Sequence, residues 1–270
     1  MSPLITRRRA AAAVLTTALL IPLAACGDSG SDQDKDKDSG SKAASSGAPK
    51  ADLTVLAAAS LTDVFKEAGA AYEKENPGTR VTFSFAGSQE LAAQVKQGAP
   101  ADALVTADTR TMDGLTGETG TPAVIAKNRL VIAVGEGNPE KVENLKDLSD
   151  AELKVVLAAP EVPVGRYSKQ ILDAQKIEVK PVSQEPNVRA VLSKVELGEA
   201  DAGIVYKTDA ATTTDKVDAI DIPDAENAVA SYPAATLKGS KHSEAAAAFV
   251  AWLSTPAAQK ILQGAGFQQP

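Results

Sequence analysis

Cysteine, histidine and aromatic residues are scarce in this chain. Its 270 residues include one Cys, one His and only 4% aromatic side chains. A single cysteine excludes an internal disulfide. One histidine and one cysteine do not supply the clustered ligands of a metal site, so we expect neither a cofactor nor a bound metal cation. The formal net charge of −7 argues against nucleic acid as a partner, because phosphate backbones require clustered Lys and Arg.

Apolar residues make up 44% of the chain, which is enough for a core in one large domain or two lobes. An apolar run, "AAAVLTTALLIPLAA", follows Arg7, Arg8 and Arg9 and is too short to span a membrane comfortably. It ends in "LAAC", residues 23–26, which resembles the bacterial lipobox. We therefore expect residues 1–26 to be a lipoprotein signal peptide whose Cys26 is lipidated. The alternative is a plain signal peptide with an unrelated cysteine.

Residues 27–50 contain no large apolar side chain. Such a segment cannot bury a core, so we expect a disordered tether. The folded body, residues 51–270, would then be held by its lipid anchor at the outer face of the cell membrane.

The two halves of this body resemble each other. The first half predicts strands at 53–60, 80–85 and 101–108 with helices at 61–76 and 89–98. The second predicts strands at 153–159, 177–183 and 200–209 with helices at 166–176 and 188–198. The second helix of each half ends in a glycine, Gly98 or Gly198, and an Ala-Asp-Ala string follows. Two βαβαβ units predict two α/β lobes, each with a mainly parallel sheet flanked by helices.

Two further apolar segments, 128–139 and 230–240, predict strands that cross between the lobes and form a hinge beside a cleft. The tail predicts two helices separated at Pro256, the second ending at Gly264, which pack on the first lobe. We assign residues 51–130 and 233–270 to the first lobe and residues 131–232 to the second. Chance similarity between βα units is the alternative to a true repeat.

Ligands of open α/β sheets bind beyond the carboxyl ends of the strands, where helices begin. The repeat places four such corners at Ser60, Ser88, Val164 and Asn187–Val188. Their side chains include no charge, which suits a fully deprotonated oxyanion such as sulfate, molybdate or tungstate. Hydrogenphosphate would need a carboxylate as acceptor, and the nearest candidates along the sequence are Glu161, Glu185 and Asp108. Taken singly, Ser60, Ser88 and Asn187 could be ordinary helix caps, and Tyr206 an ordinary aromatic residue at a strand end.

Several strings occur in an order and spacing that resemble the molybdate-binding proteins of bacterial molybdate ABC transporters. They are "VLAAASLTDVF", "FSFAGSQELAAQVKQGAPADALVTAD", "APEVPVGRYSKQIL", "PNVRAVLSKVELGEADAGIVYKTDA" and the closing "GAGF". The resemblance implies the type II periplasmic-binding-protein fold with an oxyanion in the cleft. It also implies the ligand donors: hydroxyl and backbone N–H of Ser60 and Ser88, backbone N–H of Val164 and Val188, and the hydroxyl of Tyr206. Val164 stands where alanine is commoner, and Gln89 stands where a further hydroxyl is common.

The expected function is that of an extracytoplasmic lipoprotein, a monomer, that captures molybdate or tungstate and delivers it to the membrane permease of an ABC importer. A sulfate-binding protein of the same fold is the main alternative. A serine-dependent enzyme is a weaker one, since the only histidine, His242, lies just before the closing helices and far from the four corners. We therefore expect no catalytic activity.

Overall fold

The computed structural model describes residues 49–270. The predicted signal peptide with Cys26, and all of the predicted tether except its last two residues, lie outside this range. Among the helices of residues 49–270, none combines the length and the hydropathy that crossing a membrane would require.

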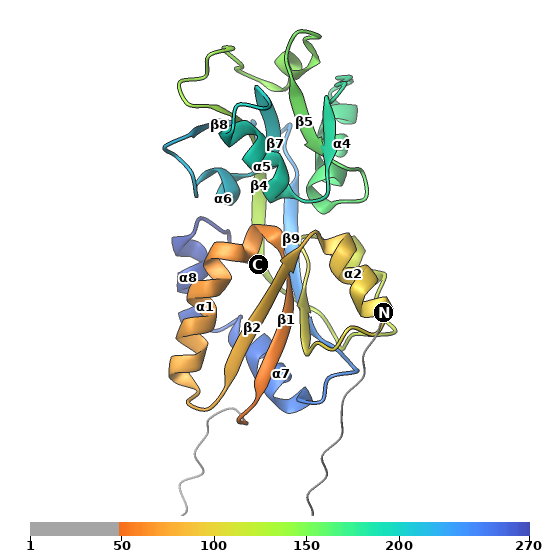
Figure 1. Cartoon of the computed structure of the whole chain (residues 1–270), viewed down its shortest axis with the longest axis vertical. Coiled ribbons are helices and arrows are strands. Elements are labelled where there is room, and N and C mark those ends of the chain that lie inside the picture. Colours follow the sequence, from red (N-terminus) through yellow and green to blue (C-terminus); the bar gives the residue numbers. More distant parts are fainter. Residues whose placement is uncertain (1–48) are drawn as a thin grey trace, which may run out of the picture. The chain divides into compact units, whose positions relative to one another are not determined.

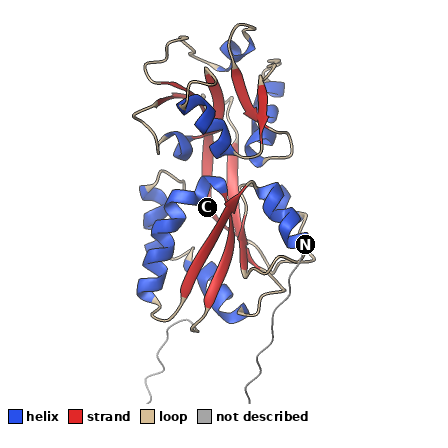
Figure 2. Cartoon of the chain, in the orientation of Figure 1, coloured by secondary structure: helices blue, strands red, loops and turns tan. Residues whose placement is uncertain are grey.

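The two βαβαβ units predicted from the sequence are both present. The first contains β1 (Asp52–Ala58), α1 (Thr62–Glu75), β2 (Arg80–Ala86), α2 (Ser88–Lys96) and β3 (Ala103–Val105). The second contains β5 (Val155–Ala158), α4 (Pro163–Ala174), β6 (Ser183–Glu185), α5 (Val188–Glu196) and β7 (Ala202–Tyr206). Strands β1, β2 and β3 pair in parallel, as do β5, β6 and β7. Figure 1 shows the two units as separate lobes. Figure 2, in the same orientation, shows helices beside the strands of each lobe.

Two long strands join the lobes, as predicted (Figure 1). They are β4 (Ala123–Gly135) and β9 (Val229–Thr236), and they are antiparallel to each other. Residues 123–129 of β4 pair with β9, whereas residues 130–135 pair with β7 and with β8 (Val217–Asp221). Strand β9 also pairs with β3. The strand order β2-β1-β3-β9-β4-β7-β5-β6 therefore runs through both lobes, with the two crossover strands in the middle.

The equivalence of the two units extends to their hydrogen bonds. In the first, Asp102 and Thr54 exchange two bonds: Asp102 N–H donates to the Thr54 carbonyl, and the Asp102 carboxylate accepts from Thr54 N–H. Asp201 and Lys154 repeat both bonds in the second unit. Gly98 and Gly198 have φ of 78° and 68°, the left-handed conformation that ends a helix and favours glycine. These matching details support a true repeat.

The few aromatic side chains are concentrated in the core of the first lobe. The buried residues of α1 recur with helical spacing, at positions 64, 65, 68, 69 and 72. Tyr72 packs edge-on against Phe249 and Trp252 of α7 (Ser243–Trp252), with ring centroids 5.1 and 5.3 Å apart. Helix α8 (Pro256–Gly264) contacts α1 as well. The predicted packing of the tail on the first lobe is confirmed.

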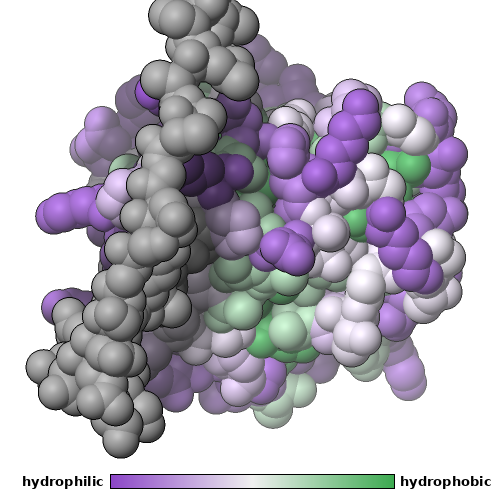
Figure 3. Space-filling model, turned by 90° about the horizontal axis from the view of Figure 1, so that it is seen from below, coloured by the Kyte–Doolittle hydropathy of each residue, from purple (hydrophilic) through white to green (hydrophobic). Residues whose placement is uncertain are grey.

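Large apolar side chains are mostly absent from the surface. On the face seen in Figure 3, hydrophilic residues surround small areas of apolar ones. Within residues 49–270, four large apolar side chains are exposed: Val124, Val182, Leu197 and Val229.

The predicted strand at 177–183 is wrong in extent, because only Ser183–Glu185 is a strand. Pro181 has no N–H for a sheet, so pairing begins after it, at the edge strand β6. Sequence analysis also missed α3 (Thr109–Asp113), the 3-10 helix η2 (Leu145–Ser149), α6 (Lys207–Ala210) and β8. Most of these elements are only a few residues long and carry too short a pattern to be recognised.

Candidate functional site

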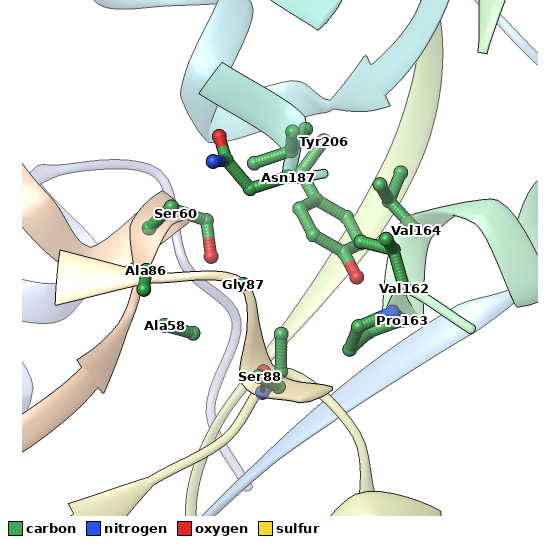
Figure 4. Close-up of a pocket in the computed structure, with 13 residues that line it drawn as sticks. Ala58, Ser60, Ala86, Gly87, Ser88, Val162, Pro163, Val164, Asn187 and Tyr206 are labelled. Atoms are coloured by element: carbon green, nitrogen blue, oxygen red, sulfur yellow. Dashed lines mark hydrogen bonds between the residues drawn. The ribbon is translucent and has the colours of Figure 1, made fainter. Parts of the chain in front are cut away.

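The four predicted corners converge on one cavity between the lobes. It encloses about 210 Å3 of space not filled by atoms, part of it open to solvent. All five predicted ligand residues line it, together with eight others, and Figure 4 shows the arrangement. The lining residues are Ala58, Ala59, Ser60, Ala86, Gly87, Ser88, Ala107, Val162, Pro163, Val164, Asn187, Val188 and Tyr206.

Ser60 lies in a 3-10 turn, η1 (Ala59–Leu61), between β1 and α1. Helix α1 begins only at Thr62, so the interpretation of Ser60 as its cap is wrong. The extra turn separates the serine from the helix, and its hydroxyl lies 2.9 Å from the hydroxyl of Tyr232 on β9. Ala58 and Ala59, which have small side chains, line the same cavity as Ser60. Figure 4 shows the Ser60 hydroxyl directed toward this cavity.

Ser88 is the first residue of α2, and Gly87 precedes it at the cap position. The cap interpretation is therefore wrong for Ser88 too. Its Oγ accepts a hydrogen bond of 3.0 Å from the backbone N–H of Ala107. Because the oxygen is already an acceptor, the hydroxyl hydrogen remains available for donation into the cavity.

Asn187 caps α5 as predicted, since its side chain accepts from Ala190 N–H at 3.0 Å. Val188 is then the first residue of α5, and Val164 is the second residue of α4 after Pro163. N–H groups in the first turn of a helix have no partner within the helix. Elsewhere in residues 49–270 these two N–H groups form no hydrogen bond either. Both helix N-termini therefore offer donors at the cavity, where the helix dipole favours an anion.

Gly165 lets the first turn of α4 approach β5 closely. A Cβ atom there would lie 2.1 Å from the carbonyl oxygen of Ala159 and 2.6 Å from that of Ala158. Any larger residue would push α4, and with it Val164, away from the strand and out of line with the cavity.

Tyr206, the last residue of β7, has a hydroxyl that is buried and without a partner within the described part of the chain. Figure 4 shows it pointing into the space between the lobes, opposite the Ser60 hydroxyl. Burial raises the pKa of Tyr206 well above its ordinary value, so the group keeps its proton and can donate it. An unpaired buried hydroxyl is costly, which points to a ligand that accepts from it.

Among residues 49–270, no charged side chain lines the cavity. Of the three carboxylates considered as acceptors for a protonated anion, Asp108 is bonded to Arg166 and Glu185 to Ser183. Glu161 does not reach the cavity either. The arrangement therefore offers hydrogen-bond donors and helix dipoles without a counter-charge and without a carboxylate acceptor.

His242 is not at the cavity. Its ring Nδ1 lies 3.3 Å from Asp102, and the side chain is 43% exposed. Neither Ser60 nor Ser88 therefore has an imidazole base beside it. Within residues 49–270, no group of His, Cys, Asp and Glu side chains could hold a metal ion.

Sequence analysis missed the groups that connect the lobes around the cavity. Gln89, in α2, donates to the carbonyl of Pro186 in the other lobe at 2.7 Å. Two ion pairs also span the lobes: Arg166 with Asp108, and Arg189 with Asp63 at 2.8 Å. Sequence analysis missed Tyr232 as well. An aromatic residue on a predicted crossover strand could have indicated a position near the cavity, because aromatic residues are rare in this chain.

A family profile described as bacterial extracellular solute-binding protein matches residues 53–268. The chain belongs to this family. Family members bind solutes outside the cytoplasm and are not defined by a catalytic reaction, which agrees with a cavity lined by donors and lacking a base.

A relative within this solute-binding family, the molybdate-binding protein ModA of Mycobacterium tuberculosis, is 41% identical over 221 residues, covering 81% of this chain and 85% of the relative. The solved periplasmic molybdate-binding protein of Azotobacter vinelandii is 22% identical, with a TM-score of 0.69 and coverage of 81% and 99%. The sulfate-binding protein SubI of Mycobacterium tuberculosis is 20% identical, with a TM-score of 0.72 and coverage of 81% and 86%. These structures confirm the type II periplasmic-binding-protein fold.

Proposed function

We propose that this protein captures molybdate, and tungstate as its close analogue, in the cavity between the lobes and delivers it to the membrane permease of an ABC importer. The observation that carries the proposal is a set of uncharged donors around one cavity, including the buried Tyr206 hydroxyl, which has no partner within residues 49–270. The 41% identity to a molybdate-binding relative supports molybdate as the ligand. The protein would have no catalytic activity.

In this proposal each donor forms a hydrogen bond with one oxygen of the oxyanion, and two donors can bind the same oxygen. Ser60 and Ser88 give hydroxyl and backbone N–H groups, Val164 and Val188 give backbone N–H groups, and Tyr206 gives its hydroxyl. A fully deprotonated anion only accepts hydrogen bonds and so satisfies every donor. The net charge of −7 is no obstacle, because exposed charges are screened beyond roughly 8–10 Å while the donors act at contact distance.

Sulfate is the alternative ligand, because it has the same charge and also only accepts hydrogen bonds. The similarity to SubI concerns the fold alone at 20% identity and does not favour one anion. The higher identity to the molybdate-binding relative is the reason to prefer molybdate.

The proposal includes the layout of the chain. Residues 51–130 and 233–270 would form the first lobe and residues 131–232 the second, a division supported by β4, which changes partner from β9 to β7 between residues 129 and 130. Cys26, lipidated, would anchor a monomer to the outer face of the cell membrane through the tether at 27–50.

Titration calorimetry and thermal unfolding with molybdate, tungstate and sulfate test the ligand. We expect molybdate and tungstate to bind more tightly and to stabilise the protein at concentrations where sulfate does not. A ligand at 100 times its Kd adds about 2.7 kcal/mol to the free energy of unfolding. Equal stabilisation by sulfate, or none by molybdate, would contradict the assignment.

A further inference from the structure

Leu130 lies at a gap in the strand pairing of β4. Arg129 is the last residue of β4 that pairs with β9, and Val131 is the first that pairs with β8. If the register of β4 with β9 continued by one residue, Ala228 would lie opposite Leu130. The gap lies where β4 exchanges β9 for β7 as its partner and so passes from one lobe to the other. The segment 222–228, which joins β8 to β9, supplies a side chain at this point.

The side chain of Asn227 fills this gap. Its Oδ1 accepts from the backbone N–H of Leu130 at 3.1 Å, and its Nδ2 donates to the carbonyl of the same residue at 2.9 Å. A paired strand residue would make the same two bonds. Oδ1 also accepts from Ala228 N–H at 2.8 Å, and Nδ2 donates to the Ile222 carbonyl at 3.3 Å. The amide therefore ties β4 to both ends of the segment that joins β8 to β9.

These four bonds require an asparagine at position 227. An amide has two hydrogens on its nitrogen and two lone pairs on its oxygen, and all four are used here. An aspartate offers no hydrogen to the two carbonyls, and a serine offers only one. Because Leu130 is buried, its backbone N–H and C=O would be costly to leave unpaired. The choice of residue is therefore specific to this point of the fold.

Leu130 also connects Asn227 to the cavity between the lobes. It lies directly opposite Tyr206 in the antiparallel pairing of β4 with β7. Tyr206 carries the buried hydroxyl that lines this cavity, so Asn227 holds the strand residue beside which the tyrosine is placed. Asn227 itself does not line the cavity. Any effect of Asn227 on a ligand must therefore act through the backbone of β4 and through its neighbours.

We propose that Asn227 is a positioning residue for ligand capture, which clamps the two crossover strands together where they meet the second lobe. The proposal rests on the proposed function and deepens it. With the clamp in place, the bending of β4 and β9 during closure is confined to a few residues on the side of the first lobe, and the lobes close in one geometry. Without it, β4 can also move at Leu130, so the donors of the two lobes are less well preorganised for the anion.

Asn138 offers a matched control within one lobe. Its Oδ1 accepts from Val142 N–H at 3.0 Å and its Nδ2 donates to the Val142 carbonyl at 2.9 Å, the same pair of bonds that Asn227 makes with Leu130. Both residues lie between β4 and β5, away from the crossover. Asn138 has φ of 48°, a conformation that aspartate tolerates well. Asn138→Asp and Asn227→Asp therefore make the same chemical change: each adds one negative charge and removes the donation to a carbonyl.

Calorimetry and stopped-flow with molybdate and tungstate test the clamp. We expect Asn227→Asp to bind both anions about tenfold more weakly, chiefly through faster dissociation, because the lost bonds hold the closed lobes together. The factor should be the same for both anions, since Asn227 does not line the cavity. Asn227→Ala should show the same loss without an added charge, which excludes repulsion of the anion as the cause. Asn138→Asp should lower the free energy of unfolding and leave both affinities unchanged.

Hydrogen exchange measured by mass spectrometry tests the clamp without any ligand. In both Asn227 variants, the backbone of residues 129–134 and 202–206 should exchange at least about fivefold faster than in the wild type, because these segments lose their fixed partner at Leu130. In Asn138→Asp, exchange in these two segments should match the wild type.

Four results would overturn the inference. They are wild-type affinity in both Asn227 variants, equal weakening in Asn138→Asp, different factors for molybdate and tungstate, and wild-type exchange at residues 129–134. A wild type that binds neither anion would instead refute the proposed function. The exchange measurement would still decide whether Asn227 holds the strands together, so the two failures can be distinguished.

Discussion

The hydroxyl of Tyr206 shows how one residue can reveal a binding site. The side chain closes β7 and packs edge-on against Tyr232, with ring centroids 5.9 Å apart, so its position is set by the core. Its oxygen gains nothing from that packing, because it is buried without a partner in the part of the chain that the structure describes. An unpaired buried hydroxyl lowers the stability of the fold. Its presence at the cavity is best explained by a hydrogen bond to a bound ligand.

Tyr206→Phe should therefore separate binding from stability. We expect the free energy of unfolding without ligand, measured in urea, to stay the same or rise slightly. Molybdate affinity should fall by about 1.5–3 kcal/mol, the contribution of a hydrogen bond to a charged acceptor. Tyr167→Phe is the matched control, because Tyr167 is a half-buried tyrosine of α4 that does not line the cavity. It should largely preserve molybdate affinity; unchanged affinity in Tyr206→Phe as well would exclude the Tyr206 hydroxyl from the site.

At the scale of elements, the site depends on where helices begin. Helix α5 begins at Val188 because Asn187, in extended conformation, caps it and leaves the Val188 N–H without a partner among residues 49–270. Helix α4 begins at Pro163 and lies close to β5 through Gly165. In both cases the side chain at the corner is an apolar valine, since the backbone is the proposed donor.

Val188→Pro tests a backbone donor directly. Proline is well tolerated as the first residue of a helix, and the extended conformation of Asn187 suits a following proline. The variant should fold and yet bind molybdate at least about tenfold more weakly, because one N–H to a charged acceptor is gone. Val188→Ala keeps the N–H and removes more side-chain volume. If calorimetry gives both variants the same affinity, the Val188 N–H is not a ligand donor.

At the scale of the whole molecule, the lobes are held together around the cavity by polar contacts. Arg166 bonds to Asp108 on one side, and Arg189 pairs with Asp63 at 2.8 Å on another. Arg189 also pairs with Asp209, whose pKa burial raises to about 6 against the opposing effect of the guanidinium. Because the pairs of Arg166 with Asp108 and of Arg189 with Asp63 span both lobes, they exist only when the lobes are close, and they should slow ligand release.

Asp63→Asn should raise the dissociation rate constant of molybdate about twofold to fivefold, measured by stopped-flow. The effect is small because Asp63 is half-exposed, and exposed ion pairs contribute roughly 0.2–1 kcal/mol. This increase in the dissociation rate constant should become smaller at high salt, because salt screens the ion pair. Asp173→Asn is the matched control: its ion pair with Lys169 has similar exposure but lies within α4. Equal acceleration by both variants would show that the contact between lobes is irrelevant to release.

Much of the fold could be predicted because its signals are local. The alternation of apolar runs with amphipathic segments placed all the strands of the two units except the second strand of the second unit, where Pro181 delayed pairing. Gly98 and Gly198 marked two helix ends through a conformation that other residues rarely adopt. Asn187 was a correct cap, whereas Ser60 and Ser88 were not. A 3-10 turn before α1 and a glycine before α2 shifted each helix start by one residue.

The sequence by itself therefore determined the two α/β units, their crossover strands and five positions that meet at one cavity, because each depends on neighbours a few residues away. Only the tertiary structure decided which side chains from distant segments meet around that cavity. Ser60 and Tyr232 are 172 residues apart, and Arg189 meets Asp63 across the lobes. A hydroxyl is donor or acceptor according to what it touches, and no local pattern encodes a contact between segments so distant along the chain.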